Sequence, residues 1–132
     1  MRTILLIDDE KKMRQKFKKL LKTEKFRVLE AESAIEVADI LMREHSTIDL
    51  ILLDMNLPEV DGRGIFDIVD EYAPELPIII TSVNPINDQK LQIPRAVDYY
   101  QKLQDEKILL TKVRSALGLT NVSAAKNKRK IT

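Results

Sequence analysis

Short apolar runs alternate along the chain with longer segments in which apolar residues recur every three or four positions. The first run, Thr3 to Ile7, is continuous and of strand length, as expected for a strand that is covered on both faces. In residues 11–23 the apolar positions 13, 17, 20 and 21 form one stripe, which predicts an amphipathic helix with a basic outer face. This strand-then-helix order favours an α/β fold with a parallel sheet.

The same alternation continues to residue 118. Four more strands are predicted, at residues 26–30, 48–53, 78–82 and 97–101. Three more helices are predicted: one from Ser33 through Arg43, one after Gly62 that ends before Pro74, and one from Asp105 to Gly118. Residues 83–95 contain two prolines and leave room for at most two helical turns.

The helix after Ser33 has a clear start signal. Ser33 followed three positions later by Glu36 matches the capping-box pattern. We expect Ile35, Ala38, Met42 and the neighbouring apolar residues of this helix to face the core.

Composition fits one domain. The chain has 132 residues, of which 44% are apolar and 33% charged, which is typical of a globular protein with a single core. There are no cysteines, so disulfides, thiolate catalysis and cysteine metal sites are excluded. No apolar run approaches the roughly 20 residues of a membrane span, and no secretory signal pattern is present, so we expect a cytoplasmic protein without membrane contact. Residues 1–119 are expected to fold, and the polar, basic residues 120–132 to fray.

Charge is unevenly distributed. Residues 11–27 hold nine Lys or Arg against a single acid, Glu24. Such a block is either a solvated helix face or a docking surface for an acidic partner. We expect no direct nucleic-acid binding by this domain.

The polar residues that end the strands are the candidates for chemistry. In an open parallel sheet of order 2-1-3-4-5, ligands bind at the carboxyl ends of the strands. The strand-end residues are Asp8, Asp9, Asp54, Thr81, Ser82 and Lys102. Three neighbouring carboxylates repel one another unless a cation lies among them, and with only oxygen ligands the expected ion is Mg²⁺. A lysine and a hydroxyl opposite would complete a site for a tetrahedral anion, and an aspartate can itself accept a phosphoryl group.

This constellation resembles the receiver domain of two-component response regulators over about residues 2–118. The resemblance depends on four stretches: Leu6 to Glu10, Asp49 to Gly62 with its Pro58 and Asp61-Gly62, Pro77 to Ser82, and Ala96 to Lys102. It implies a flavodoxin-like, doubly wound (βα)5 three-layer sandwich. It also implies a signalling phosphoacceptor rather than an enzyme.

The resemblance assigns roles to individual residues. Asp54 would accept a phosphoryl group from a phosphohistidine on a histidine kinase or phosphotransfer protein. Asp8, Asp9, Asp54 and the backbone carbonyl of Asn56 would bind Mg²⁺, and Lys102 would pair with the phosphoryl oxygens. Ser82 or Thr81 would be the switch hydroxyl and Tyr99 the switch aromatic. The fourth helix, the fifth strand and the fifth helix would form a face that binds an unknown output partner or makes a weak homodimer.

Three features depart from the family pattern. Leu103 follows Lys102 where the family usually has proline after a cis bond, so this loop either takes a trans path or tolerates strain. Val83 stands at a position that is usually small if Ser82 is the switch residue. The fourth helix is short.

The departures leave an alternative function open, which is a degenerate receiver that acts as an adaptor without phosphorylation. A haloacid dehalogenase-type enzyme fits less well, because that chemistry needs a second aspartate two residues after the first. FMN binding is equally disfavoured, because the loop after the first strand is acidic.

Overall fold

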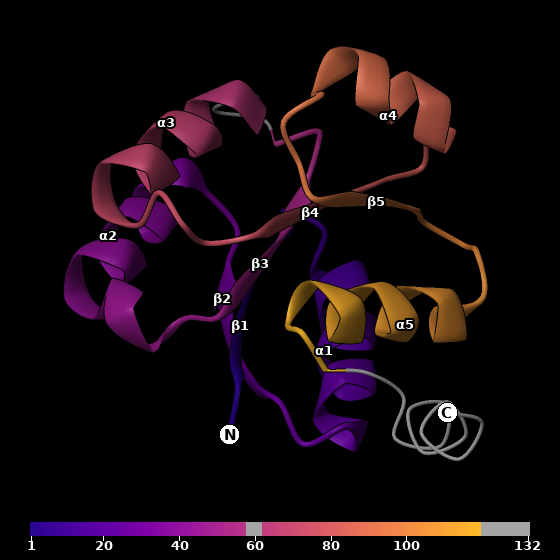
Figure 1. Cartoon of the computed structure of the whole chain (residues 1–132), viewed down its shortest axis with the longest axis horizontal. Coiled ribbons are helices and arrows are strands. Elements are labelled where there is room, and N and C mark those ends of the chain that lie inside the picture. The colour runs from indigo at the N-terminus through magenta and orange to yellow at the C-terminus, as the bar shows by residue number, and fades with distance from the viewer. Residues whose placement is uncertain (58–61, 120–132) are drawn as a thin grey trace, which may run out of the picture.

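The computed structural model describes residues 1–57 and 62–119. Five parallel strands form one sheet in the order β2-β1-β3-β4-β5, with helices on both faces (Figure 1). The strands are β1 (Thr3–Ile7), β2 (Arg27–Ala31), β3 (Leu50–Asp54), β4 (Ile78–Ser82) and β5 (Asp98–Gln101). The helices are α1 (Lys11–Thr23), α2 (Ala34–Glu44), the 3₁₀ turn η1 (His45–Thr47), α3 (Gly62–Tyr72), α4 (Ile86–Gln92) and α5 (Glu106–Ala116). The predicted fold class and strand order are confirmed.

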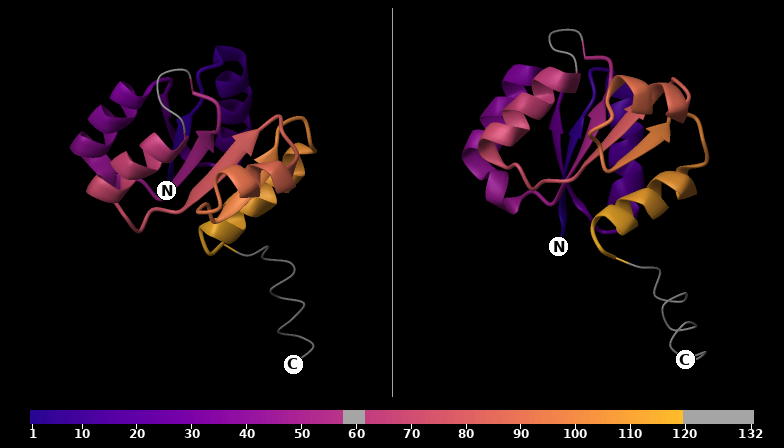
Figure 2. Two further views of the ribbon diagram at one scale, coloured as in Figure 1. Left: turned by 90° about the horizontal axis from the view of Figure 1, so that it is seen from above. Right: turned by 45° about the horizontal axis from the view of Figure 1, so that its top comes forward.

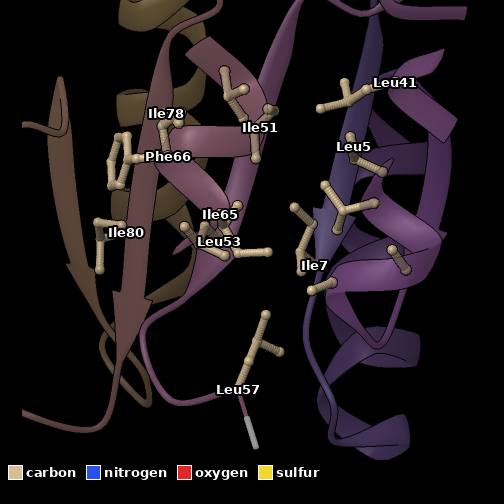
Figure 3. Close-up of a cluster of buried hydrophobic side chains, with 14 of the residues drawn as sticks. Leu5, Ile7, Leu41, Ile51, Leu53, Leu57, Ile65, Phe66, Ile78 and Ile80 are labelled. Atoms are coloured by element: carbon tan, nitrogen blue, oxygen red, sulfur yellow. The ribbon is translucent and has the colours of Figure 1, made fainter. Parts of the chain in front are cut away.

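Two apolar layers hold the helices against the sheet. Side chains alternate between the faces of a strand, so neighbours in β1 enter different layers. Ile4 packs in the layer that contains Phe17 of α1 and Leu109 of α5. Leu5 packs with Leu41 of α2 in the other layer, part of which is drawn in Figure 3. The two groups of helices are visible from two further directions in Figure 2.

Strands β2, β3 and β5 begin one or two residues later than predicted, and in β2 and β3 the reason is that the first predicted residue closes a turn. The N–H of Phe26 donates to the carbonyl of Leu21 in α1, and the N–H of Ile48 donates to the carbonyl of His45. These backbone groups are therefore committed before β2 and β3 begin. The strand boundaries move by one or two residues, but the pattern of buried positions is unaffected.

Two helices end on a residue in the left-handed region. After α1, Lys25 has φ 63° and donates to Lys22, while the next N–H reaches back to Leu21. After α5, Gly118 has φ 72° and makes the equivalent bond to Ser115. Both ends are Schellman motifs, but only the second has the glycine that this conformation favours.

The predicted inward face of α2 is wrong. The side chains of Ile35 and Met42 are 81% and 62% exposed, and Ala38 is only partly buried. The helix instead buries the stripe that contains Val37 and Leu41. Both stripes are apolar and both have helical spacing, so the sequence pattern could not decide which one meets the sheet.

The length of the helix in the irregular segment was predicted correctly, and two further expectations concern residues outside the described part of the chain. The helix in the irregular segment is α4, with seven residues, as the available room predicted. Within the described residues, no helix is long and apolar enough to cross a membrane. The predicted fraying of residues 120–132 and the turn residues 58–61 lie outside the described part of the chain.

Candidate functional site

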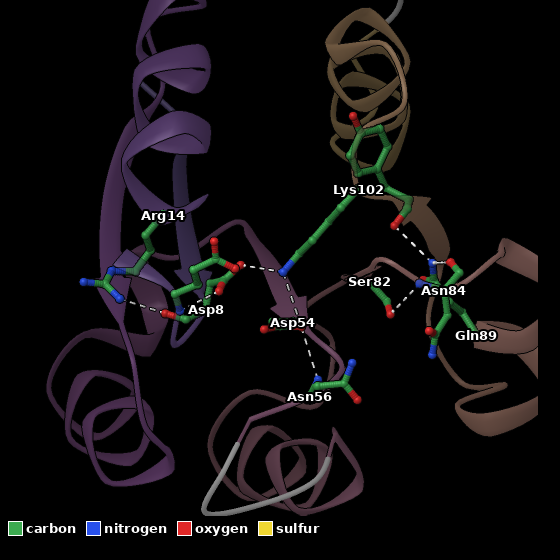
Figure 4. A network of polar contacts seen from close by, with 10 residues as sticks. Asp8, Arg14, Asp54, Asn56, Ser82, Asn84, Gln89 and Lys102 are labelled. Atoms are coloured by element: carbon green, nitrogen blue, oxygen red, sulfur yellow. Dashed lines mark hydrogen bonds and ion pairs between the residues drawn. The ribbon is translucent and has the colours of Figure 1, made fainter. Parts of the chain in front are cut away.

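Four strands deliver polar side chains to one edge of the sheet. Asp8 follows β1, Asp54 ends β3, Ser82 ends β4 and Lys102 follows β5. Because all the strands are parallel, their carboxyl ends meet at this edge, as predicted. Figure 4 shows Lys102 extending toward the carboxylates of Asp8 and Asp54 from the opposite side.

Three carboxylates form an acidic cluster. One oxygen from each of Asp8, Asp9 and Asp54 lies within 4.8 Å of the others. Asp8 and Asp54 are buried, whereas Asp9 is exposed. The cluster therefore has a dry inner side and an outer side that is open to solvent.

Lys102 is the buried cation that contacts two carboxylates of this cluster. Its Nζ lies 2.9 Å from Oδ2 of Asp8 and 3.5 Å from Oδ1 of Asp54, and its side chain is almost completely buried. One ammonium against three carboxylates leaves two negative charges uncompensated. A divalent cation with a preference for oxygen ligands fits this donor set in charge and in chemistry.

Burial perturbs Asp54. The pKa of its carboxyl is raised from 3.8 to about 6: desolvation by burial is the largest cause, and it outweighs the positive charge of Lys102 and the hydrogen bond from the Asn56 N–H, which lower the pKa. The charges of Asp8 and Asp9 add smaller upward contributions. Such a perturbed carboxyl in a cluster of charged groups is typical of a functional site.

The turn after β1 is held by its own backbone and by α1. Oδ1 of Asp8 accepts a hydrogen bond of 2.9 Å from the N–H of Glu10. Arg14 donates from Nη1 to the carbonyl oxygen of Asp8 at 2.9 Å, and its guanidinium is paired with Glu30 and Glu32 of the neighbouring segment. The sequence analysis treated Arg14 as part of the basic helix face and missed this contact. Its position one turn into the helix that follows Asp8 was the available signal.

The carboxylate of Asp54 is oriented by the backbone of the segment that follows β3. The N–H of Asn56 donates to Oδ1 of Asp54 at 3.2 Å. Within the described residues, both polar contacts of the Asp54 carboxylate use Oδ1. The other oxygen, Oδ2, is therefore the one that these contacts leave available.

The two hydroxyl candidates are both buried at the end of β4. Thr81 is paired with Asp54 across the strands, and its carbonyl accepts from the N–H of Met55. Ser82 lies one residue further on: its carbonyl accepts a 2.7 Å hydrogen bond from the N–H of Lys102, and its Oγ accepts from the N–H of Asn84 at 3.1 Å. The backbone thus joins Ser82 directly to the residue that carries the ammonium.

The side chain of Tyr99 is buried in an apolar layer and makes its polar contact with the backbone. Its ring packs in the layer that contains Ile93, and its hydroxyl donates to the Ile93 carbonyl at 2.5 Å. Burial raises the pKa of the Tyr99 hydroxyl. In this conformation the ring is turned into the protein, 5% exposed.

The loop after β5 takes a trans path. All peptide bonds in the described residues are trans, and Leu103 has φ 78° with its side chain 80% exposed. A non-glycine residue in this region is strained by about 1–2 kcal/mol. The departure from proline is therefore accommodated by Leu103, and Lys102 still points into the cluster.

Comparisons with known proteins agree on one family. Residues 4–114 match the family model of the response regulator receiver domain. Among curated proteins, the probable transcriptional regulator ycf27 of Porphyridium aerugineum is 28% identical over 94% of this chain and 51% of its own length. The transcriptional regulatory protein CpxR of Escherichia coli is 29% identical over 89% of this chain and 50% of its own length. The chain thus spans about half the length of these relatives.

Solved structures show the same likeness. A response regulator receiver domain protein from Clostridium thermocellum superposes with a TM-score of 0.80 and 27% identity, covering 89% of this chain and 95% of its own. The response regulator protein TrrA of Thermotoga maritima, solved in complex with Mg²⁺-BeF, has a TM-score of 0.78 and 25% identity, covering 89% of this chain and 100% of its own.

Proposed function

The chain belongs to the response regulator receiver domain family, and we propose that Asp54 is its phosphoacceptor and that Mg²⁺ is required for the transfer. The observation that carries this proposal is the position of Lys102 between Asp8 and Asp54. Three apolar side chains in these positions would stabilise the protein at least as well as a buried ammonium with two buried carboxylates, so packing does not explain the charged group. It does serve a site where an anion must be received beside a carboxylate.

The oxygen ligands for Mg²⁺ would be the carboxylates of Asp8, Asp9 and Asp54 and the backbone carbonyl of Asn56. When bound, the ion supplies positive charge that reduces the repulsion between the carboxylates and an incoming phosphoryl group. Support comes from the two uncompensated charges of the cluster and from TrrA, which was solved with Mg²⁺-BeF.

Asp54 would act as the nucleophile through Oδ2. A bond forms between this oxygen and phosphorus while the bond from phosphorus to an imidazole nitrogen of the donor breaks. The imidazole keeps the electron pair and takes a proton. The N–H of Asn56 and the ammonium of Lys102, both on Oδ1, keep the carboxylate in one orientation during the attack.

Lys102 would then pair with the new phosphoryl oxygens, because the Asp54 carboxylate loses its own negative charge when it forms the acyl phosphate. Ser82 is the hydroxyl that we assign to the remaining oxygen, in preference to Thr81, because its backbone is bonded to that of Lys102. Water would later attack the same phosphorus, the bond from phosphorus to Oδ2 of Asp54 would break, and inorganic phosphate would leave, so the domain would remove its own phosphoryl group.

Tyr99 is assigned the part of the coupled aromatic. Its ring is already turned into the protein, and a rearrangement would break the hydrogen bond from its hydroxyl to the Ile93 carbonyl. This rearrangement of Tyr99 would follow the movement of the Ser82 hydroxyl on β4, which is the neighbouring strand. Modifications commonly act in this way, through a local charge that biases a packing change.

The phosphoryl donor would be a phosphohistidine on a histidine kinase or phosphotransfer protein. Helix α1 presents a basic outer face, which favours a donor with acidic residues around its histidine. The exposed apolar side chains Leu91, Val97, Leu103 and Ile108 lie on α4, β5 and α5 or the segments that flank them, and would form the output face or a weak homodimer.

The site does not favour the adaptor alternative, because Asp8, Asp9, Asp54 and Lys102 lie together in an arrangement that could hold a metal ion and an anion. Mass spectrometry after incubation with acetyl phosphate separates the two. We expect one added phosphoryl group with Mg²⁺ and none with a chelator.

The Asp54→Asn variant should take up no phosphoryl group, while Asp67→Asn, an exposed aspartate on α3, should behave like the wild type. Equal uptake by Asp54→Asn, or no uptake by the wild type, would contradict the assignment of Asp54.

A further inference from the structure

One buried side chain near the site was not anticipated from the sequence. Gln89 is fully buried, and it is the only buried residue of α4. The apolar Leu91 on the same helix is 82% exposed. Helix α4 is therefore attached at this point by an amide rather than by an apolar side chain. A buried amide is unfavourable unless it is hydrogen-bonded, so its contacts determine what it does.

The amide nitrogen of Gln89 connects the two segments that carry the phosphoryl-facing groups. Nε2 donates to the carbonyl of Asn84 at 2.8 Å and to the carbonyl of Tyr100 at 3.2 Å (Figure 4). Asn84 lies two residues after Ser82, and Tyr100 lies two residues before Lys102. Both neighbours of Nε2 are acceptors, which fixes the orientation of the amide.

Asn84 is held at both ends of its backbone. Its N–H donates to Oγ of Ser82, and its carbonyl accepts from Gln89. The hydroxyl of Ser82 can turn toward a phosphoryl group only by leaving the N–H of Asn84. The same event therefore changes the residue that Gln89 holds.

The other atom of the amide has no partner. Within the described residues, Oε1 of Gln89 is the one buried side-chain polar atom without a hydrogen bond. An unpaired buried acceptor is unfavourable, and a rearrangement that supplies a donor is favoured. The backbone of segment 83–85 offers the N–H groups of Val83 and Asn84, because Pro85 has none, and the side-chain NH₂ of Asn84 is the other donor of this segment.

We infer that Gln89 is a positioning residue for phosphoryl transfer to Asp54: it sets the resting position of the Ser82 hydroxyl through Asn84 and passes its movement to α4. The N–H of Asn84, released when Ser82 turns, is the donor for the unpaired Oε1. This inference rests on the proposed function for its role in signalling. The coupling of Ser82 to Gln89 exists in the unphosphorylated protein and can be tested there.

The first experiment uses no phosphodonor. Unfolding equilibria of the full chain are measured for Ser82→Ala, Gln89→Met and the double variant. We expect the double variant to differ from the product of the single effects by at least about threefold in the unfolding constant, since the two residues share Asn84 as a partner. Gln92→Met makes the same change at an exposed position of α4 and should be multiplicative with Ser82→Ala.

The second readout is spectroscopic, and a purely structural role would leave it unchanged. In ¹⁵N NMR spectra, Ser82→Ala should shift the side-chain NH₂ resonances of Gln89 as well as the backbone amide of Asn84. With Mg²⁺ and beryllofluoride, the backbone amides of residues 86–92 should shift in the wild type and in Gln92→Met. In Gln89→Met these shifts should shrink to less than about half, while shifts next to Asp54 remain.

The inference is overturned if the effects of Ser82→Ala and Gln89→Met on the unfolding constant are multiplicative and the side-chain NH₂ resonances of Gln89 do not shift in Ser82→Ala. It is also overturned if Mg²⁺ and beryllofluoride shift the backbone amides of residues 86–92 as much in Gln89→Met as in the wild type. If the wild type shows no response to Mg²⁺ and beryllofluoride, the proposed function fails, and the double-variant measurement still decides for or against the coupling.

Discussion

The ammonium of Lys102 lies 2.9 Å from a carboxylate oxygen of Asp8, although 94 residues separate the two along the chain. Both side chains are nearly inaccessible to solvent, and Asp54 lies on the other side of the same ammonium at 3.5 Å. Lys102 is the only buried Lys or Arg among the described residues. This contact therefore governs the electrostatics of the site.

Replacement of this lysine should be strongly destabilising. Lys102→Met leaves two buried carboxylates without a cation, so the free energy of unfolding in chelator should fall by about 3–5 kcal/mol. Addition of Mg²⁺ should restore part of the loss. The exposed Lys107 on α5 offers a control, and Lys107→Met should change stability by less than about 0.5 kcal/mol in urea titrations. Equal effects of the two changes would show that the buried pair contributes nothing.

The stability of the metal-free protein should depend on Asp54 and on pH. Because the pKa of Asp54 is about 6 when folded and 3.8 when unfolded, its proton stabilises the folded state below about pH 4. This contribution is lost as the pH rises through 6. The rise in pKa corresponds to at most about 3 kcal/mol, which solvent screening reduces to about 1–2 kcal/mol.

Asp54→Asn has no such proton to lose. The free energy of unfolding of this variant, relative to that of the wild type, should therefore increase by about 1–2 kcal/mol between pH 4 and pH 7. The measurement is urea unfolding of chelator-treated samples. A constant difference across this pH range would mean that the pKa of Asp54 is not raised.

Two neighbouring residues of α2 should respond differently to truncation. Leu41→Ala removes a fully buried side chain and should lower the free energy of unfolding by about 2–5 kcal/mol. Met42→Ala removes one that is 62% exposed and should change it by less than about 0.5 kcal/mol. Thermal unfolding of both variants checks this. The opposite order would restore the face that the sequence pattern suggested.

Substitutions after α1 and after α5 should change the stability in opposite directions. Lys25→Gly should raise stability by about 1 kcal/mol, because glycine adopts φ 63° without a steric penalty. Gly118→Ala should lower it by about 1 kcal/mol at φ 72°, and an added Cβ there meets nothing within 4 Å, so only the backbone contributes. Changes of the same sign in urea unfolding would contradict the two Schellman motifs.

The strained loop after Lys102 should also be sensitive to residue type. Leu103→Gly should stabilise by about 1 kcal/mol, whereas Leu103→Pro should destabilise, because proline fixes φ near −65° and the loop has 78°. Leu91→Gly, at an exposed leucine within α4, should lower stability by about 1 kcal/mol. Destabilisation by Leu103→Gly comparable to that of Leu91→Gly would exclude the strain.

The sequence by itself determined the strands, the helices and the edge at which their polar residues meet. Continuous apolar runs allow only buried parallel strands, and in such a sheet Asp8, Asp54 and Lys102 must end on one side whatever the packing details. For that reason these three residues converge, although the ends of several strands and helices differ by one or two residues from the prediction.

Only the tertiary structure decided which of two apolar stripes of α2 is buried, and how Leu103 replaces proline. It also decided that Gln89 and Arg14 hold the backbone of the site. These outcomes depend on contacts between segments distant in sequence or on backbone dihedral angles, and neither is encoded in local periodicity. A glutamine in a short polar helix looks like a surface residue until the carbonyls of Asn84 and Tyr100 are seen to lie against it.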